Sequence, residues 1–266
     1  MRRSALVLLG AAALDVLLAS GVAWAATINC RAIADRCYGT NGSDTINGSG
    51  VRDIIYGAAP DDGTIPNDAA DAIYGNGGAD KIDGNGGADD LYGNDDKDLI
   101  FGGDGNDTLS GNEGDDEFFG GDGEDVAKGG AGADHVNINQ QILGDDRYYG
   151  GPGNDWLLDE VGRNVLSGGA GNDNLLGHSK LIGGRGDDNI YGDARDEETP
   201  DEGPRGILGG PGNDTVRSSG ATNDTIYISD GERDTVGCGG GTDTVYFDKG
   251  VDRFIYNSSC EHRVPR

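Results

Sequence analysis

The sequence predicts an all-β fold, a solenoid in which short strands stack as two parallel sheets. Three observations predict it. The 266-residue chain contains 51 glycines, its Asp and Glu outnumber Lys and Arg by 48 to 20, and a nine-residue motif recurs from Gly39 almost to the C-terminus. Such a composition supplies too few apolar residues for an ordinary globular core. The chain is therefore either disordered or organised by something other than a core.

The repeat is clearest in residues 75–137, which form seven unbroken nine-residue units. Each unit has Gly at its first position, Asp at its sixth and an apolar residue at its eighth. The pattern recurs in six further units, at 39–47, 48–56, 150–158, 168–176, 183–191 and 209–217. Repetition on this scale indicates a repeat architecture. We predict a periodic body over 39–256, a cap over 26–38 and a short tail over 257–266.

Each unit predicts a turn followed by a short strand. The first six residues are rich in Gly, Asn and Asp, which favour turns and tolerate left-handed conformations. The last three alternate polar, apolar and polar, so only the eighth residue points inward. Because each turn reverses the chain, two units make one coil, and alternate units build the two sheets. The body is long enough for about twelve coils.

Three stretches interrupt the pattern, about 57–74, 138–149 and 192–208, and the last is strongly acidic. The stretches 57–74 and 192–208 are either solvated excursions from the coil edge or docking sites.

The interruptions also determine where outward aromatic residues lie. If the first interruption, 57–74, forms one irregular coil, Tyr56, Tyr74 and Tyr92 share one sheet as an outward ladder, with Phe101 and Phe119 on the other. Such ladders usually stabilise neighbouring strands. An exposed stripe can also stack on sugar rings, which makes polysaccharide of the cell surface or matrix an alternative partner.

The net charge of −28 disfavours nucleic acid and anionic lipid as partners and favours cations. Stacking brings the position-six carboxylates of neighbouring coils together, where they repel each other. A hard divalent cation held by these carboxylates and by backbone carbonyls of the glycine-rich turns reverses the sign of that interaction. Calcium fits better than zinc, because the available ligands are oxygens and the chain has only three His. Magnesium is disfavoured, because it demands small octahedral sites.

The units resemble the RTX, or haemolysin-type, calcium-binding nonapeptide GGxGxDxUx. The resemblance implies a parallel β-roll with several Ca²⁺ ions between turns, held by position-six Asp side chains and by carbonyls of positions one to four. The implied carbonyl-bearing glycines include Gly102, Gly120 and Gly129. The implied Asp ligands are Asp80, Asp98, Asp116 and Asp134 along one edge, Asp89, Asp107 and Asp125 along the other, and Asp44, Asp53, Asp155, Asp173, Asp188 and Asp214 elsewhere.

Two turns depart from the family pattern. Asp96 replaces the position-four Gly of 93–101, which puts the carbonyl geometry of that turn in question. Asn164 stands where Asp belongs, which weakens any site at 159–167. The alternative for any single Asp is that it only caps its turn.

The four cysteines form one pair at each end of the repeat, Cys30 with Cys37 and Cys238 with Cys260. An even count in an exported chain favours disulfides. Three connectivities are possible, and pairing within each end is favoured because the rod separates the two ends. A Cys-rich metal site, the alternative, lacks CxxC spacing and nearby His. Cysteines flanking the roll, together with the stretch DGERDTVGCGGGTDTVYFDKGVDRF, resemble small secreted RTX proteins of actinobacterial type.

Residues 1–25 predict a secretory signal peptide, because Arg2 and Arg3 precede an apolar stretch that ends in Ala23-Trp24-Ala25. An uncleaved membrane anchor is the alternative. In either interpretation Asp15 is unfavourable, because a charge within the apolar stretch opposes membrane insertion. We expect a secreted, extracellular chain with no membrane insertion after cleavage.

The sequence favours a non-enzymatic protein with a structural or adhesive role. It contains no HExxH or GxSxG motif, and no long segment outside the repeat. His135, His178 and His262 form no obvious catalytic constellation with a Cys or Ser. The alternative function is a carbohydrate-binding or accessory module of a secreted system.

Overall fold

The computed structural model describes ten stretches of the chain, which are 26–30, 36–40, 43–57, 69–138, 145–159, 164–177, 180–192, 205–219, 223–255 and 260–266. The signal peptide prediction and His178 lie outside these residues, as do most of the predicted interruptions 57–74 and 192–208 and half of the one at 138–149. The described residues form strands and turns without a helix, so none of their segments is a helix long and apolar enough to span a membrane.

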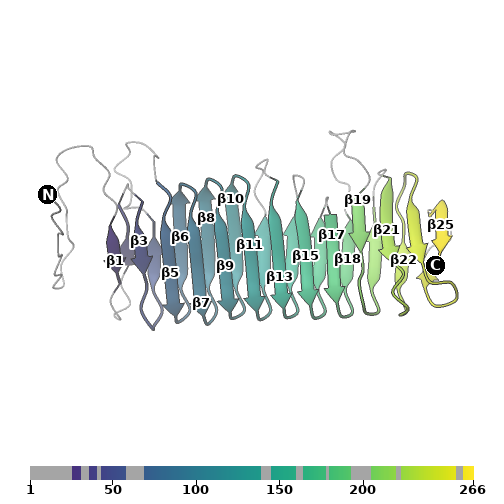
Figure 1. Ribbon diagram of the computed structural model, residues 1–266, viewed down its shortest axis with the longest axis horizontal. Coiled ribbons are helices and arrows are strands. Elements are labelled where there is room, and N and C mark those ends of the chain that lie inside the picture. The colour runs from purple at the N-terminus through teal and green to yellow at the C-terminus, as the bar shows by residue number, and fades with distance from the viewer. Residues whose placement is uncertain are drawn as a thin grey trace.

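The strands form two parallel sheets that face each other along a rod, with β1 at one end and β25 at the other (Figure 1). Sheet A contains the odd-numbered strands, which are β1 (Thr27–Asn29), β3 (Thr45–Asn47), β5 (Ala72–Gly77), β7 (Asp90–Asp95), β9 (Thr108–Glu113), β11 (Val126–Ala131), β13 (Arg147–Pro152), β15 (Val165–Ala170), β17 (Lys180–Arg185), β19 (Arg205–Leu208), β21 (Asp224–Ile228), β23 (Thr244–Phe247) and β25 (His262–Pro265).

Sheet B contains the even-numbered strands, which are β2 (Arg36–Tyr38), β4 (Ile54–Tyr56), β6 (Lys81–Gly86), β8 (Leu99–Asp104), β10 (Glu117–Asp122), β12 (His135–Ile138), β14 (Trp156–Asp159), β16 (Asn174–Gly177), β18 (Asn189–Gly192), β20 (Thr215–Ser218), β22 (Thr235–Gly237) and β24 (Arg253–Phe254). Successive strands therefore alternate between the sheets. This confirms the predicted parallel β-roll.

The core is a single file of side chains from each sheet. Leu91 pairs in register with Leu109, and Ile82 with Ile100, each pair joining neighbouring coils. These position-eight residues are fully buried, while their neighbours at positions seven and nine face outward. The core is thin because most strands contribute one inward apolar side chain, as the alternating pattern predicted, whereas β21 contributes Ile226 and Ile228.

The two edges of the roll differ in regularity. We call turns that lead from sheet A into sheet B the B edge, and turns that lead from sheet B into sheet A the A edge. Across the B edge, the step between inward-facing residues is nine residues, as from Ile73 to Ile82, except for the ten from Ile226 to Val236. Across the A edge the step varies. It is eighteen residues from Ile55 to Ile73, twelve from Val136 to Tyr148, six from Leu175 to Leu181 and seventeen from Ile190 to Ile207.

The interruption at 57–74 corrects one prediction. β4 and β5 are consecutive strands on opposite sheets, and β3 pairs directly with β5, with Thr45 level with Ala72. The interruption therefore lengthens one turn instead of adding a whole coil. Tyr56 consequently lies in sheet B, opposite Tyr74 and Tyr92 in sheet A, so the predicted ladder of three tyrosines is wrong.

The outward aromatic residues stack in pairs instead. Ring centroids lie 4.7–5.1 Å apart in four nearly parallel pairs, which are Tyr38–Tyr56, Tyr74–Tyr92, Phe101–Phe119 and Tyr227–Tyr246. Lys81 bridges two of these pairs, because its Nζ lies 5.1 Å from the Tyr56 ring centroid and 4.9 Å from that of Phe101. The rings thus tie neighbouring strands together on the outer face.

Each end of the described roll carries a disulfide. Cys30–Cys37 links the end of β1 to β2, and Cys238–Cys260 links the segment after β22 to the segment before β25. This is the pairing that the sequence favoured. The bridges restrain the terminal coils, each of which has a neighbour on only one side.

Replacing Leu109 by Ala tests the single-file core. Leu109 is fully buried between Leu91 and Ala127 of the neighbouring strands, so its loss leaves a cavity. We expect the free energy of unfolding, measured by urea denaturation in saturating calcium, to fall by about 2–5 kcal/mol. The control is Thr108→Ala, at the adjacent outward position. Equal effects of the two substitutions would contradict the assignment of the core.

Candidate metal sites along the two edges

A ladder of buried aspartates runs along the B edge. Each position-six Asp lies at the start of a strand, and its backbone N–H donates to Oδ1 of the corresponding Asp one coil further on. The distance is 2.8 Å from Asp80 to Asp98, 2.8 Å from Asp98 to Asp116 and 2.9 Å from Asp116 to Asp134. The same bond continues through Asp155, Asp173, Asp188, Asp214, Asp234 and Asp252.

The A edge carries a second ladder, but in two pieces. Its first piece contains Asp44, Asp71, Asp89, Asp107, Asp125, Asp146 and Asn164. Its second piece joins Asp224 to Asp243 and Asp243 to Glu261. The two edges thus have the Asp membership predicted for residues 80–134.

The second carboxylate oxygen of most ladder residues is buried without a hydrogen-bond partner among the described residues. This holds for Oδ2 of Asp80, Asp98, Asp107, Asp116, Asp125, Asp134, Asp155, Asp173, Asp188, Asp214, Asp234 and Asp243. A buried ionised oxygen without a partner is costly. A cation would satisfy it.

The position-one glycine of each turn leaves room for these oxygens. A Cβ at Gly75 would lie 2.5 Å from Asp80 Oδ2 and 2.7 Å from the carbonyl oxygen of Gly93 in the next coil. Gly102, Gly120 and Gly129 are equally crowded by the Oδ2 atoms of Asp107, Asp125 and Asp134. Any side chain at position one would therefore fill the space where carboxylate and carbonyl oxygens converge.

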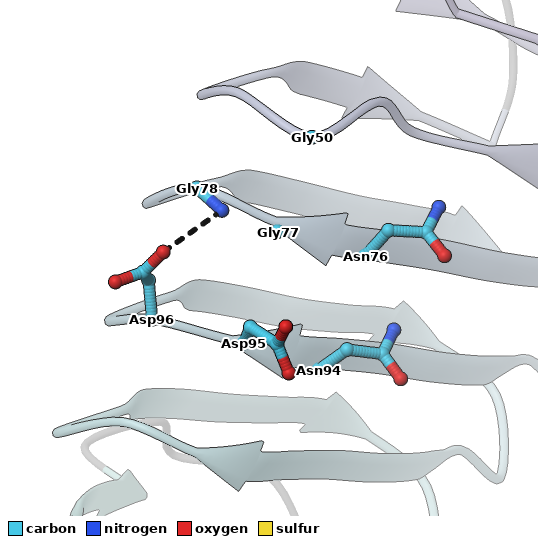
Figure 2. A pocket seen from close by; sticks show the side chains of 7 residues that line it. All are labelled: Gly50, Asn76, Gly77, Gly78, Asn94, Asp95 and Asp96. Carbon is cyan, nitrogen blue, oxygen red and sulfur yellow. Dashed lines mark hydrogen bonds between the residues drawn. The ribbon is translucent and has the colours of Figure 1, made fainter.

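Positions two and four require a positive φ. Position two is Asn76 at 78° or Gly103 at 115°, and position four is Gly105 at 132°. Asp96, the unusual position-four residue, also has a positive φ of 75°, and its carbonyl oxygen packs against Gly114 of the next coil as other position-four carbonyls do. Its turn therefore keeps the stacked carbonyls, and its carboxylate accepts a 3.2 Å bond from the N–H of Gly78 (Figure 2).

The sequence of these turns matches a known repeat. The model of the RTX calcium-binding nonapeptide repeat matches residues 38–62, 66–100, 92–127, 101–136, 143–175 and 176–194, which together are more than half of the chain. The chain belongs to this family. No curated protein matches it.

RTX repeats bind calcium, and the donors in these turns fit that ion. No cluster of three or more His, Cys, Asp or Glu side chains occurs among the described residues. A cation between coils would therefore be held by few carboxylates and by several backbone carbonyls, a set of hard oxygen ligands that suits Ca²⁺. The chain would supply Oδ2 atoms and glycine carbonyls from stacked RTX turns.

Burial changes the acidity of the RTX aspartates. Removal from water is the largest cause and raises the pKa of Asp98 and Asp234 to about 8 and that of Asp80 to about 7, while the backbone N–H bonds lower it in part. The pKa of Asp107 rises to about 6. Metal-free carboxyls at these positions therefore hold protons at pH values where ordinary aspartates are ionised.

The ligands predicted from the sequence do not include every member of the ladders. All thirteen predicted Asp ligands are buried in the ladders, but so are Asp71, Asp146, Asp224, Asp234 and Asp243. Asp71 lies nine residues before Asp80 and two before an inward Ile, a signal that the surrounding interruption obscured. His135, in contrast, faces outward beside Trp156, with ring centroids 6.2 Å apart.

Tyr148 is an unusual core residue of the RTX roll. It occupies the inward position of β13 and is fully buried. Burial and the nearby carboxylates of Asp146 and Asp125 raise the pKa of its hydroxyl, which therefore stays protonated.

The metal-free roll should lose stability as pH rises from about 4 to 8. Folded-state pKa values above the ordinary 3.8 mean that the folded chain binds more protons than the unfolded chain across this window. We expect protein stripped of metal on a chelating resin to contain more β-structure, measured by circular dichroism, at pH 5 than at pH 8. In saturating calcium the urea midpoint should instead be higher at pH 8 than at pH 5, because protons compete with the ion. A metal-free β-content that increases with pH would contradict this.

Proposed function

We propose that the chain is an exported protein whose β-roll folds when Ca²⁺ binds between stacked turns, and whose role outside the cell is structural or adhesive. The observation that carries the proposal is the pair of ladders, in which the Oδ2 atoms of most aspartates are buried and lack a hydrogen-bond partner among the described residues. A column of buried anions is unfavourable unless each is protonated or paired with a cation. Calcium binding removes the penalty and joins the coils.

The ligands in this proposal are the position-six carboxylates together with turn carbonyls. The carbonyls include those of Gly102, Gly120 and Gly129. The carboxylates are those of Asp44, Asp53, Asp80, Asp89, Asp98, Asp107, Asp116, Asp125, Asp134, Asp155, Asp173, Asp188 and Asp214, joined by Asp71, Asp146, Asp224, Asp234 and Asp243. Several ions would bind, because the geometry repeats from coil to coil.

Export is supported by two independent features. Residues 1–25 have the composition of a secretory leader. Both described ends carry a disulfide, which is typical of oxidising compartments. A chain that folds only with calcium would remain disordered in calcium-poor cytoplasm and become rigid outside.

A structural role fits the composition of the roll better than catalysis. The RTX repeat is typically structural, and repeating units account for most of the described chain. His135 is half-buried against Trp156, and His262 is exposed on β25. We therefore infer that the protein is not an enzyme.

The carbohydrate-binding alternative receives no support from the aromatic residues. Stacking on a sugar requires an open ring face. In the four stacked pairs, each ring covers one face of its neighbour, and Lys81 lies over the Tyr56 and Phe101 rings. The stacked rings suit strand-to-strand contact, so we retain the structural role and leave polysaccharide as an untested partner.

Calcium titration followed by circular dichroism tests the proposed function. We expect chain 26–266, stripped of metal at pH 7.5, to convert from coil to β-structure as calcium is added, because the ion neutralises the ladders. Magnesium should have little effect, since the turns do not offer a small octahedral site. Equal order in excess chelator and in calcium would refute the proposal.

Asp116→Asn tests the ladder itself. Asp116 lies fully buried on the B edge, with Oδ2 lacking a partner in the described chain. Loss of its charge should raise the calcium midpoint of folding by about tenfold, which is ~1.4 kcal/mol. Asp122→Asn is the matched control, because Asp122 is exposed at position three of a neighbouring turn and the charge change is identical. The ladder account fails if both variants shift the midpoint equally.

A further inference from the structure

The outer face of sheet A separates its charges along the rod. Its strands from β5 to β17 run side by side (Figure 1). Among these strands, acidic residues occur only on β7 and β9, and basic residues only on β11, β13 and β17. The acids are Asp90, Asp95 and Glu113, and the bases are Lys128, Arg147, Lys180 and Arg185. Four neighbouring strands without a carboxylate form a distinct surface in a chain with 48 Asp and Glu.

These charged side chains are available to a partner. All seven are exposed, and none of them forms an ion pair or a side-chain hydrogen bond within the described chain. Tyr149, which is 40% exposed, stands level with Lys128 in the middle of the same face. One face therefore carries an acidic part and a basic part, so a second copy of the chain offers both complementary charges.

A two-fold axis parallel to the strands would make this face complementary to itself. Such an axis, placed between β11 and β13 in the plane of contact, reverses the rod but preserves the strand direction. Residues at the same position of the repeat then oppose each other, and β7 of one copy lies opposite β17 of the other. Asp90 would meet Lys180 at position seven, and Asp95 would meet Arg185 at position three. The axis generates each pair twice.

The centre of this contact is also compatible with the sequence. There β11 lies opposite β13, so Lys128 would face Tyr149 at position nine, and Val126 would face Arg147 at position seven. An ammonium group over an aromatic ring is favourable. The central cations thus face a ring and an apolar side chain, and neither directly opposes another cation.

Other registers match the charges less well. Sliding one copy until β7 faces β13 would keep Asp90 against Arg147 but place Asp95 opposite Pro152. Of these two registers, the one that sets β7 against β17 satisfies both aspartates of β7.

The negative charge of the chain does not prevent this contact. The ladder carboxylates are neutralised by calcium in the proposed function. At physiological ionic strength, exposed charges more than about 8 Å apart are largely screened. The ion pairs across the face therefore outweigh the distant like charges on the turns.

We propose that the outer face of sheet A from β7 to β17 is a docking surface for a second copy of the chain, which packs face to face with its rod reversed. The inference deepens the proposed structural role by naming a partner, and it rests on calcium-dependent folding of the roll. Six strands of six residues present about 29 Å by 20 Å, or about 1,200 Å² for both copies, which reaches the size of a specific interface.

Sedimentation velocity of chain 26–266, with its disulfides intact and in saturating calcium, tests the dimer. We expect a species of twice the chain mass that grows no further with concentration, because a two-fold contact is closed. Added sodium chloride should weaken it by screening the pairs. Open-ended growth would contradict the two-fold arrangement. A monomer at every concentration would overturn the proposal and leave the basic strands to another anionic partner.

Charge reversal tests the register. Arg185→Asp should raise the dissociation constant of the dimer at least about tenfold, because it opposes Asp95 with a like charge at two places. Arg253→Asp is the matched control, with the same charge change at an exposed position of β24 in sheet B. Adding Asp95→Arg to Arg185→Asp should restore the dimer. Adding Asp122→Arg, at an exposed position of β10 in sheet B, should not restore it.

Equal weakening by Arg185→Asp and Arg253→Asp would overturn the proposed contact, as would equal rescue by Asp95→Arg and Asp122→Arg. Circular dichroism in calcium checks that each variant folds. Should Arg185→Asp fail to fold, Asp95→Arg alone creates the same repulsion from the opposite strand and decides the question. A parent chain that does not fold in calcium would contradict the proposed function and the dimer with it, whereas a folded monomer contradicts the dimer alone.

Discussion

The structure depends on the carboxylates of the ladder aspartates, each of which has two oxygens with different roles. One oxygen of each ladder Asp accepts the backbone N–H of the coil before it, which fixes coil spacing and register. In most of these residues the other oxygen is buried without a hydrogen-bond partner among the described residues and needs a positive charge. The first bond stacks the coils, but the second requirement makes a stack of bare anions unfavourable. Coil geometry and the proposed ion binding therefore depend on the same side chain.

This link explains features that an ordinary β-protein would not tolerate. A core with one inward residue per strand is thin, and ordering a nine-residue unit costs on the order of 10 kcal/mol in backbone entropy. Position one must lack a Cβ because oxygens converge there, and positions two and four adopt positive φ. Because glycine has this freedom in the unfolded chain, it also loses more conformational entropy on folding than other residues do. Ions between coils are thus the proposed source of the missing stabilisation.

Much of this architecture could be predicted from the sequence, because a nine-residue period fixes both the inward residue and the ladder residue. The sheet that contains Tyr74 could not be predicted, since a stretch as long as 57–74 can form either a full coil or one long turn, and only the pairing of Thr45 with Ala72 decides between them. Asp71 was missed for the same reason. The replacement of Asp by Asn164 was visible in the sequence. The hydrogen bond from its amide to Asp159, a residue that itself departs from the repeat five positions earlier, could be seen only in the fold.

The asymmetry between the edges has a physical cause. An insertion in a turn is harmless only if the ladder there is interrupted or can re-form across it. On the B edge nearly every step is nine residues, and the Asp ladder continues from Asp53 to Asp252. On the A edge steps range from six to eighteen residues, and the ladder is broken. One continuous ladder suffices to hold the register of both sheets, because each coil crosses both edges. The turns of the A edge can therefore vary, and it is these turns that differ from the repeat in length and in residue type.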